Sequence, residues 1–150
     1  MLVHVAAEGK VPREVGPTFV KSVAKKMLAT LQIKEAELSI VLTDDAQIKI
    51  LNRDYRHKDR PTDVLAFAMR EGETGQLAGD LLGDVVISLE TAARQASGQG
   101  HSLREEVVFL LGHGLLHLLG WDHETKAKDR AMRAETERLC AAAGVAAPEA

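Results

Sequence analysis

Residues 113–123, HGLLHLLGWDH, place three histidines within eleven residues in one of the most apolar regions of this chain. His113 and His117 are four residues apart, so a helix would project both rings from one face. Gly120 favours a left-handed end to that helix, which would let the following turn bring His123 toward the same point. Buried imidazoles need partners for their polar nitrogens. One divalent ion would satisfy three rings together, so the segment predicts a metal site on a buried helix.

Other interpretations of this segment remain open. The rings could be core histidines, each satisfied by a backbone hydrogen bond. The site could also be closed and structural, with Asp122 or Cys140 as a fourth ligand, whereas three protein ligands leave a position open for water, as in catalytic sites. Gly112 and Gly114 flank His113 and each costs about 1 kcal/mol in a helix. That cost predicts close approach to the backbone by a neighbouring element or by a substrate.

The whole chain is consistent with one globular domain spanning residues 1–150. Its net charge of −3 provides no overall attraction to nucleic acid or anionic membrane, so a polyanionic partner would need a local basic patch. The single cysteine, Cys140, excludes an internal disulfide and fits a reducing compartment. The N-terminus lacks a signal-peptide pattern, and the apolar region 107–121 is too short to span a bilayer. We therefore expect a cytoplasmic protein.

The apolar periodicity predicts about four strands and about five helices, with the helices concentrated toward the C-terminus. Strands are expected at residues 2–7, 36–42, 62–69 and 83–89. Helices are expected from Pro17 to Leu31, from a Thr43 cap through Tyr55, at 91–99 ending at Gly98, from a Ser102–Glu105 capping box through about Leu119, and at 125–143. Residues 70–79 are expected to form a surface loop and residues 144–150 a frayed tail. The fold class is α+β, a mixed sheet packed with helices.

The spacing His-x-x-x-His-x-x-Gly-x-x-His is that of the metzincin metalloproteases, so the predicted metal helix is zincin-like. In those enzymes a glutamate follows the first histidine and acts as the general base. Gly114 occupies that position here. A metal site that lacks this general base is poorly suited to activating water for peptide hydrolysis. A zincin-like metallopeptidase is therefore the second functional hypothesis.

With glycine after the first histidine, the segment resembles the signature of the YbeY family, bacterial single-domain metal-dependent endoribonucleases of ribosomal RNA maturation. The family pattern is roughly His-Gly-x-Leu-His-Leu-x-Gly-Tyr-Asp-His, and Trp121 stands where tyrosine is usual. The resemblance extends upstream through LNRDYRHKDRPTDVLAFA and LLGDVVIS, and covers most of residues 36–140. Residues 66–68 are Ala-Phe-Ala, whereas the family usually has Ser-Phe-Pro, so no role can be assigned to a serine or proline there.

The resemblance implies a mixed sheet packed with helices and an endoribonuclease that acts on single-stranded ribosomal RNA. It implies His113, His117 and His123 as catalytic metal ligands, usually for one Zn²⁺ ion, and Arg56 as a further catalytic residue. The implied roles are maturation of the 3′ end of small-subunit ribosomal RNA and ribosome quality control. The implied partners are ribosomal RNA and the small ribosomal subunit, with no membrane and no DNA.

Arg56 lies in the segment RDYRHKDR, residues 53–60, where four basic residues face two acidic ones for a net charge of +2. A guanidinium can bind two phosphoryl oxygens together, and Tyr55 could stack on a base. The alternative is a solvated helix end with surface ion pairs. This segment is the predicted RNA-binding face.

No general base can be identified from the sequence. Asp122 could orient a ligand histidine, His57 could assist, or the 2′-hydroxyl of RNA could itself be the nucleophile. A third hypothesis is a non-catalytic RNA-binding ribosome-assembly factor with a structural zinc. A fourth ligand from the protein would favour that hypothesis, and an open position facing Arg56 would favour the nuclease.

Overall fold

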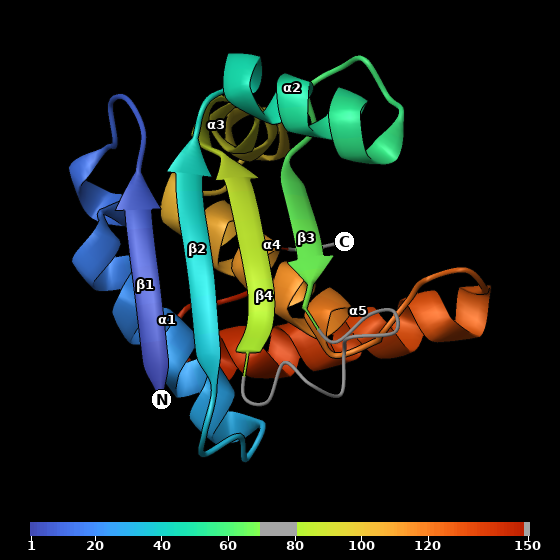
Figure 1. The fold of residues 1–150 in the computed structure, drawn as a ribbon. Coiled ribbons are helices and arrows are strands. Elements are labelled where there is room, and N and C mark those ends of the chain that lie inside the picture. Colours follow the sequence, from blue (N-terminus) through green and yellow to red (C-terminus); the bar gives the residue numbers. More distant parts are fainter. Residues whose placement is uncertain (70–80, 149–150) are drawn as a thin grey trace.

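Four strands form one mixed sheet in the computed structural model, which describes residues 1–69 and 81–148 (Figure 1). The strands are β1 (Leu2–Ala7), β2 (Glu37–Thr43), β3 (Val64–Ala68) and β4 (Leu81–Ser88). Their order across the sheet is β1-β2-β4-β3. Strands β1, β2 and β4 are parallel to one another. Strand β3 lies at the edge of the sheet and pairs antiparallel with β4. The loop expected at residues 70–79 lies outside the described residues.

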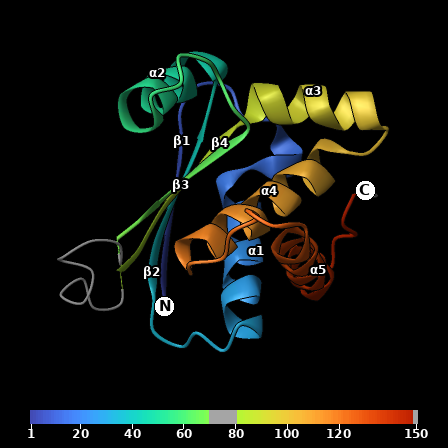
Figure 2. The same ribbon diagram turned by 90° about the vertical axis from the view of Figure 1, so that its right-hand side faces the viewer.

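The residues that the structure describes also form five α-helices and one short 3-10 turn, which confirms the predicted single α+β domain. They are η1 (Arg13–Val15), α1 (Pro17–Thr30), α2 (Asp45–Arg56), α3 (Leu89–Gln99), α4 (Leu103–Leu118) and α5 (Lys126–Ala142). Figure 2 shows α1, α3, α4 and α5 on one face of the sheet and α2 on the other. The 3-10 turn was not predicted.

The centre of the core is α4, which contacts β3, β4, α1, α3 and α5. Because neighbours surround it, its sequence is apolar on nearly every side, as expected of a buried helix. Leu111, Leu115 and Leu116 are fully buried. Within residues 1–69 and 81–148, no helix has the length and apolar character needed to cross a bilayer. The apolar region around the histidines forms part of the core, because Leu111, Leu115 and Leu116 are buried in the main apolar cluster.

Gly112 and Gly114 permit α4 to pack closely against its neighbours. A Cβ atom at residue 114 would lie 2.8 Å from Cγ1 of Val85 and 3.3 Å from Cγ2 of Val64. A Cβ atom at residue 112 would lie 3.3 Å from Cγ2 of Thr136 in α5. Both glycines thus face neighbouring elements, which answers the question left open by the sequence in favour of tight helix packing.

The two ends of α4 match the sequence prediction. Ser102 and Glu105 form the capping box, each side chain accepting the other's backbone N–H at 3.1 and 2.9 Å. At the far end Gly120 has φ +95°, and the Trp121 N–H donates to the Leu116 carbonyl at 3.0 Å. This left-handed stop turns the chain back over the helix end.

The caps of two other helices differ from the prediction. The N-cap of α2 is Asp44, whose carboxylate accepts from the Gln47 N–H at 2.9 Å, because Thr43 still belongs to β2. Helix α3 begins at Leu89, two residues before the predicted start. Its left-handed end residue is Gly100 rather than Gly98, so the helix continues through the first glycine.

The C-terminal tail is packed as far as it is described, in contrast to the expected fraying. The Val145 N–H donates to the Cys140 carbonyl at 3.0 Å. The Arg133 guanidinium donates to the carbonyl of Pro148, which is buried, at 2.6 Å. Residues 144–148 therefore fold back along α5, from its C-terminal end toward Arg133. The composition of residues 144–148 does not predict this packing, because their hydrogen-bond partners belong to α5.

Candidate metal centre and adjoining cationic pocket

The three predicted histidines converge at the C-terminal end of α4. His113 and His117 come from the helix, and His123 from the turn that follows Gly120. One ring nitrogen from each lies within 4.8 Å of the others, and the Nε2 atoms of His113 and His117 are 3.1 Å apart. Two nitrogens that ligate one tetrahedral zinc ion at about 2.1 Å are about 3.4 Å apart. The triad could therefore bind a metal ion with small ring movements.

The environment of the triad favours the neutral form of its two helix histidines, His113 and His117. Burial lowers the pKa of His113 to about 4, and the charges of His117 and His123 act in the same direction. Burial, followed by the charge of His123, also lowers the pKa of His117. A histidine must be unprotonated to ligate a metal. At neutral pH both helix rings are therefore in the state that ligation requires.

Neither candidate for a fourth protein ligand belongs to this cluster. Among the described residues, the group that could share an ion consists of the three histidines. Asp122 accepts from the Glu124 N–H at 3.1 Å and pairs with the Lys128 ammonium at 3.4 Å, so it fixes the turn that carries His123. Cys140 is buried in α5, and burial raises its thiol pKa to about 11.

A pocket of about 470 Å³ opens beside the triad. Its described lining combines two of the histidines with three cationic side chains and part of β3: Asn52, Arg56, Lys58, Arg60, Thr62, Val64, Leu65, Ala66, His117 and His123. The structure therefore brings Arg56 together with two predicted metal ligands. Lys58 and Arg60 were visible in the sequence as local positive charge, but nothing there indicated that they share this pocket. His57 is not part of the lining.

Arg56 is held against the edge strand β3. Its Nη2 donates to the Ala66 carbonyl at 2.8 Å and its Nη1 to the Tyr55 carbonyl at 3.3 Å. The guanidinium carbon lies 4.9 Å from the ring centroid of Phe67. Since a guanidinium has five N–H donors, others stay available to a ligand. The surface ion pair expected in this segment is instead made by Arg53, whose Nε is 3.0 Å from Asp54.

The connection from α2 to β3 is folded back by a buried asparagine that sequence reasoning missed. His57 adopts a left-handed conformation with φ +60°, and the Lys58 N–H donates to the Asn52 carbonyl at 3.2 Å. The Asn52 side-chain amide donates to the Arg60 carbonyl at 2.9 Å. Both contacts place Lys58 and Arg60 over the pocket. The available signal was the position of Asn52 four residues after the apolar Ile48, which places both on the inner face of α2.

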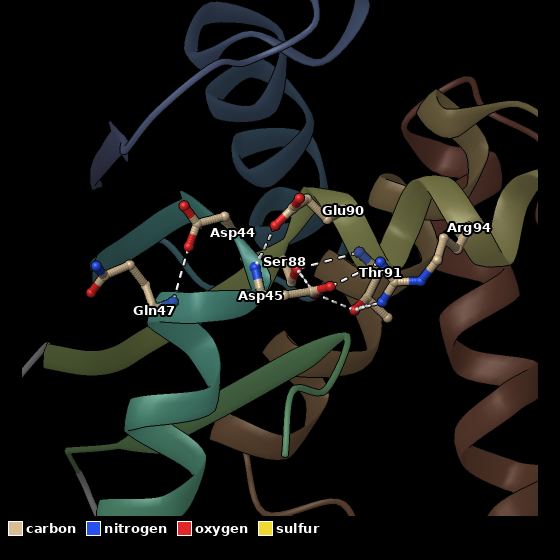
Figure 3. A network of polar contacts seen from close by, with 7 residues as sticks. All are labelled: Asp44, Asp45, Gln47, Ser88, Glu90, Thr91 and Arg94. Atoms are coloured by element: carbon tan, nitrogen blue, oxygen red, sulfur yellow. Dashed lines mark hydrogen bonds and ion pairs between the residues drawn. The ribbon is translucent and has the colours of Figure 1, made fainter. Parts of the chain in front are cut away.

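The opposite end of α2 is anchored to α3 by the polar network in Figure 3. One carboxylate oxygen of Asp45 accepts from the Ser88 and Thr91 hydroxyls at 2.7 and 2.6 Å, and the other pairs with Arg94 at 2.8 Å. The Asp45 N–H donates to Glu90 at 2.9 Å. Burial alone would raise the pKa of the Asp45 carboxyl. The hydrogen bonds that this carboxyl accepts from Ser88, Thr91 and Arg94 outweigh burial and lower its pKa. Helix α2, and the arginine at its end, are therefore fixed to the rest of the fold.

Comparisons with known proteins match most of this chain to one family. The family described as Endoribonuclease YbeY matches residues 6–144. A Geobacter metallireducens protein named Endoribonuclease YbeY is 46% identical over 123 residues, 82% of each chain. One with the same name from Pelotomaculum thermopropionicum is 54% identical over 110 residues, 71% of each chain. The solution structure of a Thermotoga maritima protein has the same fold, with a TM-score of 0.62 at 24% identity, covering 93% of this chain and 90% of that one.

Proposed function

This chain belongs to the YbeY family, and from that premise we propose that it is a metal-dependent endoribonuclease that cleaves single-stranded segments of ribosomal RNA. Relatives at 46 and 54% identity carry the name Endoribonuclease YbeY. The observation that carries the proposal is one pocket in which His117 and His123 face Arg56 and two further cationic side chains. Such a pocket suits a phosphodiester rather than a neutral substrate.

The pocket matches the charge that develops during phosphodiester cleavage. An ion bound by the triad would supply Lewis-acid stabilisation of charge on a phosphoryl oxygen. Arg56, fixed by the Ala66 carbonyl, would donate to a second oxygen of the same phosphate. Lys58 and Arg60 would attract the RNA backbone locally, although the chain as a whole is acidic.

Two observations weigh against the other hypotheses. At Gly114, where a metzincin has its glutamate, a side chain would meet Val85 at 2.8 Å, so the general base of a peptidase has no place there. A structural zinc would require a fourth protein ligand, and the described residues supply three histidines. Both favour an accessible ion in a nuclease. The described lining of the pocket contains no carboxylate, so activation of the nucleophile would not depend on one there.

The proposal includes the biological role that the family resemblance implies. The ion would be Zn²⁺, bound by His113, His117 and His123 as catalytic ligands. The substrate would be the 3′ end region of small-subunit ribosomal RNA, and the protein would act on the small ribosomal subunit in the cytoplasm, in maturation and quality control.

The proposal is tested by cleavage of a ribosomal RNA fragment with zinc-loaded protein, beside casein as a peptidase control. We expect RNA cleavage and intact casein. His117→Ala should lose bound zinc, measured by metal analysis, together with cleavage. Arg56→Gln should retain zinc and lose about 100-fold in kcat/KM, the scale for removing one donor to a developing oxyanion.

Arg53→Gln is the matched control, because Arg53 lies on the same helix, is exposed, and pairs with Asp54 outside the pocket. It should cleave RNA at the wild-type rate. Equal losses in Arg53→Gln and Arg56→Gln would mean that the effect is general charge rather than this pocket. Digestion of casein and not RNA would establish the peptidase instead.

A further inference from the structure

A second pocket, of about 320 Å³, is lined by residues of the sheet and of α2. Figure 2 shows α2 on the face of the sheet opposite α4. Apolar and aromatic side chains and one carboxylate line it: Val41, Leu51, Tyr55, Phe67, Asp84 and Val86. Ala66 lines the cationic pocket and Phe67, its neighbour in β3, lines this one. Because successive side chains of a strand point to opposite faces, the two pockets meet across the edge strand.

An aromatic pair and a guanidinium form the wall between the two pockets. Tyr55, the one tyrosine of the chain, is 61% exposed. Its ring packs edge-on against Phe67, with the ring centroids 5.4 Å apart. The Arg56 guanidinium covers the Phe67 ring at 4.9 Å and also lines the cationic pocket. Exposed aromatic rings beside cations are typical of surfaces that bind single-stranded nucleic acid.

Asp84 contributes the carboxylate of this otherwise largely apolar pocket. It projects from β4 on the same face as Val86, and burial raises the pKa of its carboxyl above the usual range. A desolvated carboxylate is stabilised by a ligand that brings N–H donors. The pairing edge of guanine presents two adjacent donors, N1–H and the 2-amino group, which match two carboxylate oxygens. Uracil presents one donor between two carbonyls and does not match.

We propose that this second pocket is a nucleobase subsite that binds an unpaired guanine of the RNA strand whose phosphate occupies the cationic pocket. The base stacks on Tyr55 and its donor edge meets Asp84. This inference rests on the proposed function. The adjoining Arg56, Lys58 and Arg60 favour an anionic strand as the occupant and disfavour a basic peptide, which is the other partner that a carboxylate in an apolar pocket could attract.

The test uses zinc-loaded protein and short oligoadenylates that carry one guanosine or one inosine, which lacks the 2-amino group. Binding is measured by fluorescence anisotropy with 2′-O-methyl oligonucleotides, and cleavage with the matching RNA. We expect the Kd of the guanosine oligonucleotide to be lower than that of the inosine oligonucleotide by a factor of about five or more. Asp84→Asn should abolish this preference, because an amide offers one acceptor oxygen in place of the two of a carboxylate and its NH₂ group would face the second donor of guanine.

Tyr55→Ala should weaken both oligonucleotides by about five-fold or more, the scale of one base stacked on an aromatic ring. Ile50→Ala is the matched control, since Ile50 is an exposed apolar residue of the same helix outside both pockets, and it should bind as the wild type does. Circular dichroism checks that each variant is folded.

The possible failures are distinguishable. If the wild type neither binds nor cleaves any of these RNAs, the proposed function is wrong and the subsite falls with it. If the wild type cleaves RNA but does not prefer guanosine, or if Tyr55→Ala binds as tightly as Ile50→Ala, the endoribonuclease stands and the base subsite is refuted. The latter result would assign the pocket to another partner, such as a basic peptide.

Discussion

Substitution of Gly114 by alanine tests how closely α4 packs on the sheet. In an exposed helix this change would stabilise the protein by about 1 kcal/mol. Here the new methyl group would lie 2.8 Å from Cγ1 of Val85 and 3.3 Å from Cγ2 of Val64. Both valines are β-branched and belong to paired strands, so they cannot rotate or withdraw cheaply. Overpacking of this kind costs about 1–3 kcal/mol, which leaves a net loss of up to about 2 kcal/mol.

Gly112→Ala is the matched control two residues away on the same helix. Its methyl group would meet Thr136 at 3.3 Å and the flexible end of Met27 at 3.5 Å. Since a methionine side chain adapts to small changes, the gain in helix propensity should roughly cancel the packing cost. We expect a stability within about 1 kcal/mol of the wild type.

The assay is urea unfolding of both variants followed by circular dichroism, with EDTA present so that metal binding does not contribute. Gly114→Ala should be less stable than Gly112→Ala by about 1 kcal/mol or more, a difference of about 2–4 °C in Tm per kcal/mol. If the two variants were equally stable, or Gly112→Ala the weaker, the explanation of these glycines by packing would be refuted.

Three further predictions concern the anchor of α2, the metal centre and the buried thiol. The hydrogen bonds of Asp45 hold its folded pKa below the unfolded value near 3.8, so its charge stabilises the fold above that pH and this contribution is lost as the pH falls through the folded pKa. Asp45→Asn should therefore cost about 1 kcal/mol in urea unfolding at pH 7, and a cost that persisted at pH 2 would contradict this. Zinc at about 100 times its Kd should raise the wild-type Tm by about 5–10 °C in a thermal scan, and His117→Ala should show no such rise. Because burial raises the Cys140 pKa to about 11, iodoacetamide at pH 8 should modify the folded protein far more slowly than the urea-unfolded chain by mass spectrometry, and rapid native labelling would show that the thiol is accessible.

The sequence by itself determined the features that depend on local spacing. The four-residue interval of His113 and His117, the left-handed Gly120 and the return to His123 are all properties of one helix and one turn, and the structure has them as predicted. The Ser102 capping box is equally local. Alternating and helical apolar patterns also specified the fold class and the order of elements. Such patterns suffice because each element must bury one face.

Local signals were insufficient where two elements compete for the same residues. Thr43 and Asp44 are both good helix caps by type, and the extension of β2 through Thr43 selected Asp44. The tail 144–148 looks like a frayed end in composition, yet it docks because Arg133 reaches the Pro148 carbonyl. In each case a contact from another element decided the outcome.

Tertiary structure alone decided how the site is assembled. Arg56 and His117 are far apart in the sequence, and they share a pocket because the edge strand β3 passes between α2 and the end of α4. The role of Gly114 depends on Val85, which belongs to a different strand. Tyr55, Phe67 and Asp84 line one pocket because three separate elements meet on one face of the sheet. Such proximities arise from the packing of elements against one another. The apolar periodicity of a single segment shows which face is buried, but it does not show which element packs against that face.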